Sequence, residues 1–377
     1  MSGSQNPDSE RGMNTCTAAI DALQQPLSST QTSLLSSVPS SATLHKDYQS
    51  LLTLIYTSTT KMTLVLRPSE PTPAAALVPI SDLGTSITSL ATCATLFDLH
   101  GATWSSYARQ AARDICHAVD SLVSTFTEDA GEEYLVRTGT VHDLIEKARR
   151  EVPADNLSAV KQCWKADRNM LEDSLGEINS MIEDAAQEGE DGDDPDFDDE
   201  WDELGFGASK KMSELELERT RKVQPLMRFA TLLHKRVVPD ILANLPTSTS
   251  DSNALTAALD ALPSRSHALV LALEELVAAL YAPQDPAALA SAVATFSDAT
   301  NKLHSSATSN ILLPPETGLV KQMGALSVAG GSGANGGEKK VKDARKWFDA
   351  CLAQVNKSAQ AIDELLSPDT ARENATR

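Results

Sequence analysis

Among the residues that are able to act as nucleophiles, general bases or metal ligands, the seven histidines and five cysteines of this sequence are considered first. The histidines are scattered and form neither a His-Glu-x-x-His nor a Glu-x-x-His pattern, so neither a protease-type zinc site nor a di-iron site in a helical bundle is predicted. Cys116 and His117 are neighbours, but adjacent positions on a helix point about 100° apart, which separates a nucleophile from its base. We therefore expect no catalytic residue, no metal ligand and no cofactor.

A glycine-rich stretch, Gly330–Gly337, invites comparison with phosphate-binding loops. Such loops follow a strand and carry the pattern GxxxxGK[ST], whereas Lys339 and Lys340 fall outside that register and no strand pattern precedes them. The composition is that of a flexible linker. The sequence also lacks a G-x-S-x-G nucleophile elbow and kinase-type motifs, so we predict neither an enzyme nor a site for a small-molecule substrate.

Acidic residues gather in one segment: thirteen lie between Glu183 and Glu203, and no Lys or Arg occurs between Arg168 and Lys210. Such a block repels itself and is expected to form an extended linker over residues 188–207. It superficially resembles a calcium loop, but the Gly and Glu that such a loop requires are missing in register. Apolar residues among the acids favour a segment that docks a basic partner surface, the alternative being a solvated spacer. The residues predicted to bind a partner are Asp193, Asp194, Asp196, Asp198, Asp199, Glu200, Trp201, Leu204 and Phe206.

The charge of the whole chain disfavours two classes of partner. Its 32 basic and 52 acidic residues give a formal charge of −20, which opposes binding to nucleic acid and to anionic membranes. Basic residues between Lys210 and Arg236 suggest, on their own, the DNA-binding region of a helix-loop-helix factor. Acids at positions 214, 216 and 218 interleave with them, so a solvated helix face, paired internally with the acidic segment, is the favoured interpretation.

Apolar residues recur every three or four positions along most of the chain, which is the spacing of an amphipathic helix. Alternating strand patterns do not occur, and no apolar run approaches the 18 residues of a membrane-spanning helix. Thr72, Thr103 and the Ser213-x-x-Glu216 box are candidate N-terminal caps, and Pro225 and Pro239 are expected to kink the helix after the box. The predicted helices cover residues 43–66, 73–100, 103–126, 134–150, 156–182, 213–241, 253–262, 266–282, 286–306 and 339–366.

These helices predict an all-α protein of two antiparallel helical bundles joined by a disordered acidic linker. The N-terminus lacks a secretory pattern and the cysteines form no CxxC pair, so we expect reduced thiols in an intracellular protein. The predicted parts are a disordered tail (1–13), an N-terminal bundle (14–187, opening with a weakly periodic helix at 16–27), the linker (188–207), a C-terminal bundle (208–368, with a flexible glycine-rich loop at 324–338) and a tail (369–377).

The order of these features resembles a known family. A helical half ending in a long acidic helix is followed by an acid-rich linker that closes in Asp202-Glu203-Leu204-Gly205-Phe206, and then by the capped basic helix MSELELERTRKVQPLMRFATLLHKRV. This arrangement is similar to that of the cyclin-D-binding proteins, the family of GCIP, the Grap and cyclin-D interacting protein. The resemblance extends from about residue 43 to about residue 366.

The resemblance implies a non-enzymatic adaptor built from two helical bundles and found in cytoplasm and nucleus. Its implied partners are cyclin D-type and helix-loop-helix proteins, and its implied role is regulation of the cell cycle or of transcription. A different class remains open, because long amphipathic helices with only 4% aromatic residues also suit a cytoskeletal helical-bundle module of the vinculin or talin type.

Overall fold

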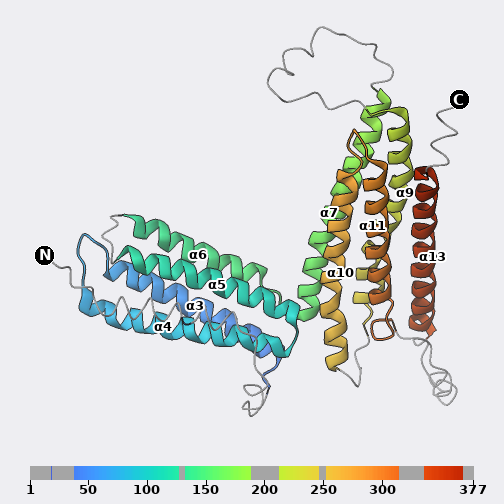
Figure 1. Cartoon of the computed structure of the whole chain (residues 1–377). Helices are drawn as coiled ribbons and strands as arrows, with labels where there is room; N and C mark the ends of the chain where they lie inside the picture. The colour runs from blue at the N-terminus through green and yellow to red at the C-terminus, as the bar shows by residue number, and fades with distance from the viewer. Residues whose placement is uncertain are drawn as a thin grey trace, which may run out of the picture. The chain divides into compact units, whose positions relative to one another are not determined.

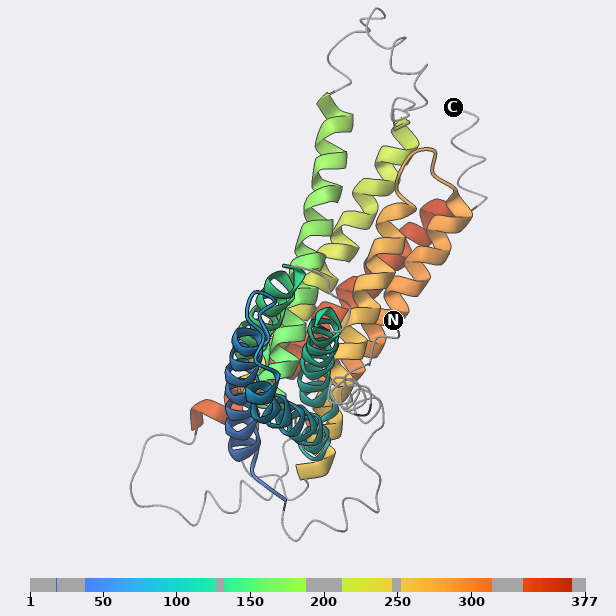
Figure 2. The same cartoon turned by 90° about the vertical axis from the view of Figure 1, so that its left-hand side faces the viewer.

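The computed structural model describes residues 38–126, 132–187, 212–245, 252–313 and 335–367, together with Ala18. These residues form α-helices with short 3-10 and π-helical segments and contain no strand, which confirms the predicted all-α class. The chain divides into two compact units, Met1–Gln162 and Cys163–Arg377 (Figures 1 and 2). The predicted tails, the weak first helix, the acidic linker and most of the glycine-rich loop lie outside the described residues.

The described residues of the first unit form a four-helix bundle in which α3 contacts α4 and α6, and α5 contacts the same two helices (Figure 1). Tyr48, Phe97 and Trp104 are fully buried in its core, and the Tyr48 hydroxyl donates a 2.9 Å hydrogen bond to the carbonyl of Ala108. Its helices are α3 (Ser41–Val65), α4 (Pro73–Leu96) with the 3-10 segment η1 (Phe97–Leu99), α5 (Ala102–Thr125) and α6 (Glu133–Glu151).

The start of α5 differs from the prediction, because Gly101 and not Thr103 is its N-cap. Gly101 has a φ of 145°, which other residues rarely adopt. The capping bond comes from another part of the chain: the Trp104 backbone N–H donates to Oδ1 of Asn156 at 3.0 Å, and the Trp104 indole donates to the Pro153 carbonyl at 2.6 Å. These bonds fasten the start of α5 to the start of α7 (Asn156–Gln187).

The described residues of the second unit form a bundle of five helices. α13 contacts both α9 and α11, and α11 contacts α10, while α7 joins the bundle by a side-chain bond to α9 and by Asp167, whose carboxylate lies 3.5 Å from Nδ1 of His267 on α10. The bond to α9 runs from the Gln224 amide to Asn179 at 2.6 Å. The elements after α7 are α9 (Glu214–Val237), the π-helical η2 (Val238–Leu242), α10 (Ser252–Ala278), α11 (Pro286–Ala307) and α13 (Asn335–Leu366).

The division between the units differs from the predicted end of the N-terminal bundle at residue 187. Residues 163–187 of α7 belong to the second unit. Trp164, Leu171 and Ile178 are fully buried there, and the Trp164 indole donates a 2.9 Å hydrogen bond to the carbonyl of His234 on α9. The composition changes at the acidic segment, but the packing changes within a continuous helix.

Prolines interrupt the helices less than their sequence positions suggest. α9 continues through Pro225, whereas Pro239 lies in the π-helical segment η2. The predicted break between residues 262 and 266 is wrong, because α10 is one helix that runs through Pro263. Leu262 and Ser266, on either side of this proline, are fully buried, so packing of a continuous face outweighs the backbone bond that the proline removes.

One helical stretch among the described residues, Pro73–Leu99, is long and apolar enough to cross a membrane by length and composition. A core helix of a soluble protein meets the same criterion. In this fold Leu83, Ile87 and Leu90 pack into the core of the first unit, while the threonines at positions 85, 88 and 92 are exposed.

Candidate functional site

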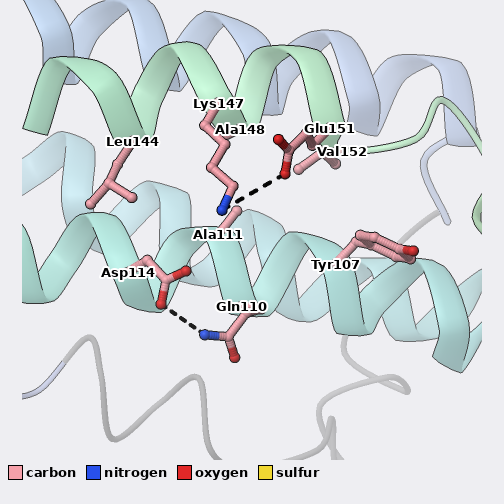
Figure 3. Close-up of a pocket in the computed structure, with 9 residues that line it drawn as sticks. All are labelled: Tyr107, Gln110, Ala111, Asp114, Leu144, Lys147, Ala148, Glu151 and Val152. Atoms are coloured by element: carbon pink, nitrogen blue, oxygen red, sulfur yellow. Dashed lines mark hydrogen bonds and ion pairs between the residues drawn. The ribbon is translucent and has the colours of Figure 1, made fainter. Parts of the chain in front are cut away.

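A shallow groove of about 200 Å³ runs between α5 and α6 in the first unit (Figure 3). Its floor is apolar and includes Ala111 from α5, Leu144 and Ala148 from α6, and Val152, the residue directly after α6. Leu144 and Ala148 stand four positions apart, so they lie one above the other along the same helix face, and Val152 follows Ala148, to whose carbonyl its backbone N–H donates. Because the side chains of Ala111 and Ala148 are small, they leave the hollow between the larger side chains around them unfilled.

Polar side chains form the rim of this groove (Figure 3). On α5, the Gln110 amide donates to the Asp114 carboxylate at 2.7 Å, and on α6 the Lys147 ammonium lies 3.9 Å from the Glu151 carboxylate. Each pair lies along its own helix and leaves the floor open. An apolar floor with a polar rim suits the apolar face of a partner helix, because such grooves bind helices through anchors spaced three or four residues apart.

The second unit contains a serine and a histidine at the distance of a nucleophile and its base. The Ser266 hydroxyl lies 2.7 Å from Nε2 of His234, and the His234 ring stacks on Trp164 with ring centroids 4.3 Å apart. Both members of the pair are 0% exposed, and burial, followed by the positive charge of Arg168, lowers the pKa of His234 to about 3. No substrate reaches this pair as it is packed here, so we assign it a structural role.

Other side chains that could take part in chemistry are separated from one another or already paired. Cys116 is buried and His117 is exposed, so the two do not form a pair. Arg109 is paired with Asp98 at 2.5 Å inside the first unit. No three His, Cys, Asp or Glu side chains are grouped for a metal ion within the part of the chain that the structure describes.

The predicted partner-binding residues, Asp193 to Phe206, all lie outside the described residues, so the structure does not test that prediction. The sequence analysis also missed the groove and the Ser266–His234 pair. It predicted the helices at 103–126 and 134–150 without their relative orientation, and it considered the histidines only by their spacing in the sequence. A spacing within one helix does not reveal which face of another helix will meet it.

Comparison with known families places the helices in context. Residues 47–184 match the family model described as Grap2 and cyclin-D-interacting, N-terminal, and residues 197–305 match its C-terminal counterpart. The gap between the two matches falls within the acid-rich part of the sequence. A comparison with individually curated proteins finds no match. The two matches together cover more than half of the chain, which confirms the resemblance found in the sequence. The chain belongs to the Grap2 and cyclin-D-interacting family.

Proposed function

We propose that this protein is a non-enzymatic adaptor that binds cyclin D-type or helix-loop-helix proteins and regulates the cell cycle or transcription in cytoplasm and nucleus. Family membership supports a protein-binding role, because the family is described by its interaction with Grap2 and cyclin D. The finer choice of partner and compartment is our inference from the resemblance. The chain contains no Arg-x-Leu tripeptide of the cyclin-docking type, so a cyclin would bind through a folded surface.

The observation that carries the proposal is the groove between α5 and α6. Its apolar floor around Ala111 and Ala148 is open, and polar groups on its rim already have partners along their own helices. A partner helix gains binding energy by covering the floor, while these rim groups keep their hydrogen bond and ion pair. The acids at positions 193–200, with Trp201, Leu204 and Phe206, are the second proposed contact, where they attract a basic partner surface and raise its association rate.

The test is a binding titration of the purified full chain with a recombinant cyclin D and with a helix-loop-helix protein. Ala111→Leu fills the groove, and we expect it to weaken binding about tenfold or more. Ala75→Leu, at an exposed position of α4, is the matched control and should bind as the wild type does. Circular dichroism checks that both variants fold.

A second variant replaces the acids between 188 and 203 by Asn or Gln. We expect slower association and a weaker dependence on salt than in the wild type. If neither protein binds the wild-type chain, the proposed function is wrong. Co-sedimentation with actin under the same conditions would instead favour the cytoskeletal alternative.

A further inference from the structure

Helix α9 carries a basic outer face. Arg221, Lys222, Arg228 and Lys235 are exposed, whereas Val223, Leu226 and Ala230 between them are fully buried in the second unit. We call these four cations the basic face. It lies in a chain whose formal charge is −20, so it stands out from the rest of the molecule.

Most of the basic face lacks a counterion among the described residues. The Lys235 ammonium lies 3.2 Å from Glu172 of α7, and Arg168 shares the same carboxylate oxygen at 3.5 Å. Arg221, Lys222 and Arg228 have no ion pair within the ranges that the structure describes. Three exposed cations without partners on one helix form a surface that attracts an anionic chain.

We propose that the basic face of α9 is the docking surface for residues 188–203 of the same chain. This segment contains eleven acidic residues and no Lys or Arg. It belongs to the stretch that joins α7 to α9, and Figures 1 and 2 show these two helices side by side, with α7 ending and α9 beginning at the same end of the second unit. The complementary charges are therefore tethered next to one another.

The length of the tether permits the contact. From Glu203 to the first residue of α9, Glu214, an extended chain spans up to about 36–40 Å. α9 has 24 residues and is about 36 Å long. The acids are thus able to reach every cation of the face, and a tether of this kind raises the local concentration of the segment to the order of millimolar.

The consequence is a competition between α9 and a partner, and this part rests on the function proposed above. While the acidic segment lies on α9, its carboxylates are paired with the cations of the basic face. A basic partner must compete with these cations to bind the segment. Weakening the face should therefore free the segment and tighten the binding of a basic partner.

The direct test is carbodiimide cross-linking of the full chain, which joins lysines to carboxylates in contact. We expect Lys222 and Lys235 to be linked to residues 188–203 within one molecule at low ionic strength, and the links to disappear at about 0.5 M salt. Lys357, an exposed lysine on α13, is the control and should form at least about fivefold fewer such links. Equal yields at Lys222 and Lys357, or links only between two molecules, would overturn the proposal.

The second test measures competition with a synthetic amphipathic peptide rich in Lys and Arg. The triple substitution Arg221→Gln, Lys222→Gln and Arg228→Gln should raise the affinity of the full chain for this peptide about five- to tenfold. The triple substitution Lys302→Gln, Lys346→Gln and Lys357→Gln changes the net charge equally on α11 and α13, and should have a smaller effect.

The two tests separate this inference from the proposed function. The same affinity for both triple variants would reject competition at α9. If no variant binds the basic peptide, the partner role of the acidic segment fails, and the cross-links alone decide whether the segment docks on α9.

Discussion

His234 is a neutral histidine in the core of the second unit, and its burial makes a prediction about pH. Its pKa is lowered to about 3, whereas an unfolded histidine titrates near 6.5. Between these two pKa values the histidine is protonated in the unfolded chain and neutral in the folded chain, so acidification below pH 6.5 favours unfolding. We expect this residue to lower the free energy of unfolding by about 3 kcal/mol between pH 7 and pH 4.

Urea titrations of the wild type and of His234→Phe over this pH range measure the effect. The variant should lose part of the pH dependence, while His117→Gln, at an exposed position of α5, should retain it. An unchanged pH dependence in His234→Phe would contradict the assignment.

Gly101 is the second residue with a sharp prediction. Its φ of 145° disfavours any side chain, and a Cβ atom there would lie 2.1 Å from Cγ of Asn156. Gly101→Ala must therefore displace Asn156 and break its bond to the Trp104 backbone, and we expect it to destabilise the protein by about 3 kcal/mol. Gly139→Ala is the control: its Cβ meets nothing within 4 Å inside α6, and it should stabilise by about 0.5–1 kcal/mol. Chemical denaturation of both variants checks the opposite signs.

At the scale of the helix, apolar spacing was sufficient to predict most boundaries. The predicted ranges 134–150 and 286–306 became α6 (Glu133–Glu151) and α11 (Pro286–Ala307). The break at Pro263 was predicted from the local tendency of proline to end a helix. The helix continues because packing of the buried residues on either side, Leu262 and Ser266, outweighs that tendency. The groove was not predictable in this way, since it arises where α5 meets α6 and neither helix encodes the register of the other.

The capping box at the start of α9 was predicted from the sequence. Its hydrogen bonds allow the loss of stability in two substitutions to be ranked. The Ser213 hydroxyl accepts from the Glu216 backbone at 3.3 Å, and the Glu216 carboxylate accepts from the backbone N–H groups of Ser213 at 2.8 Å and of Gln284 at 2.7 Å. Ser213→Ala removes one cap and should destabilise by about 1 kcal/mol. Glu216→Ala removes the bonds to two parts of the chain and should destabilise by about 2 kcal/mol. Thermal denaturation beside Glu214→Ala, an exposed control, tests the ranking, and a larger effect of Ser213→Ala would contradict it.

At the scale of the whole molecule, composition and packing divide the chain at different places. The matched family models end and begin at residues 184 and 197, near the acidic segment, whereas the compact units meet between Gln162 and Cys163. Composition marks where solvation and charge change. Packing depends on which buried side chains touch, and Trp164 meets His234, which lies 70 positions further along the chain, a contact that no local pattern reveals. The division was therefore less predictable than the helices that it divides.

Two compact units imply two cores whose stabilities are separable. Ile55→Ala removes a fully buried side chain from the first unit, and Leu273→Ala removes one that is 1% exposed in the second, so each should destabilise its own unit by about 3 kcal/mol. In differential scanning calorimetry we expect each variant to lower a different unfolding transition, and the double variant to lower both transitions, each by the amount seen in the corresponding single variant. The exposed substitution Ala353→Ser on α13 should move neither transition. If both single variants shifted one common transition, the two cores would unfold as a single cooperative unit, because separate cores cannot transmit the loss of one buried side chain to the melting of the other.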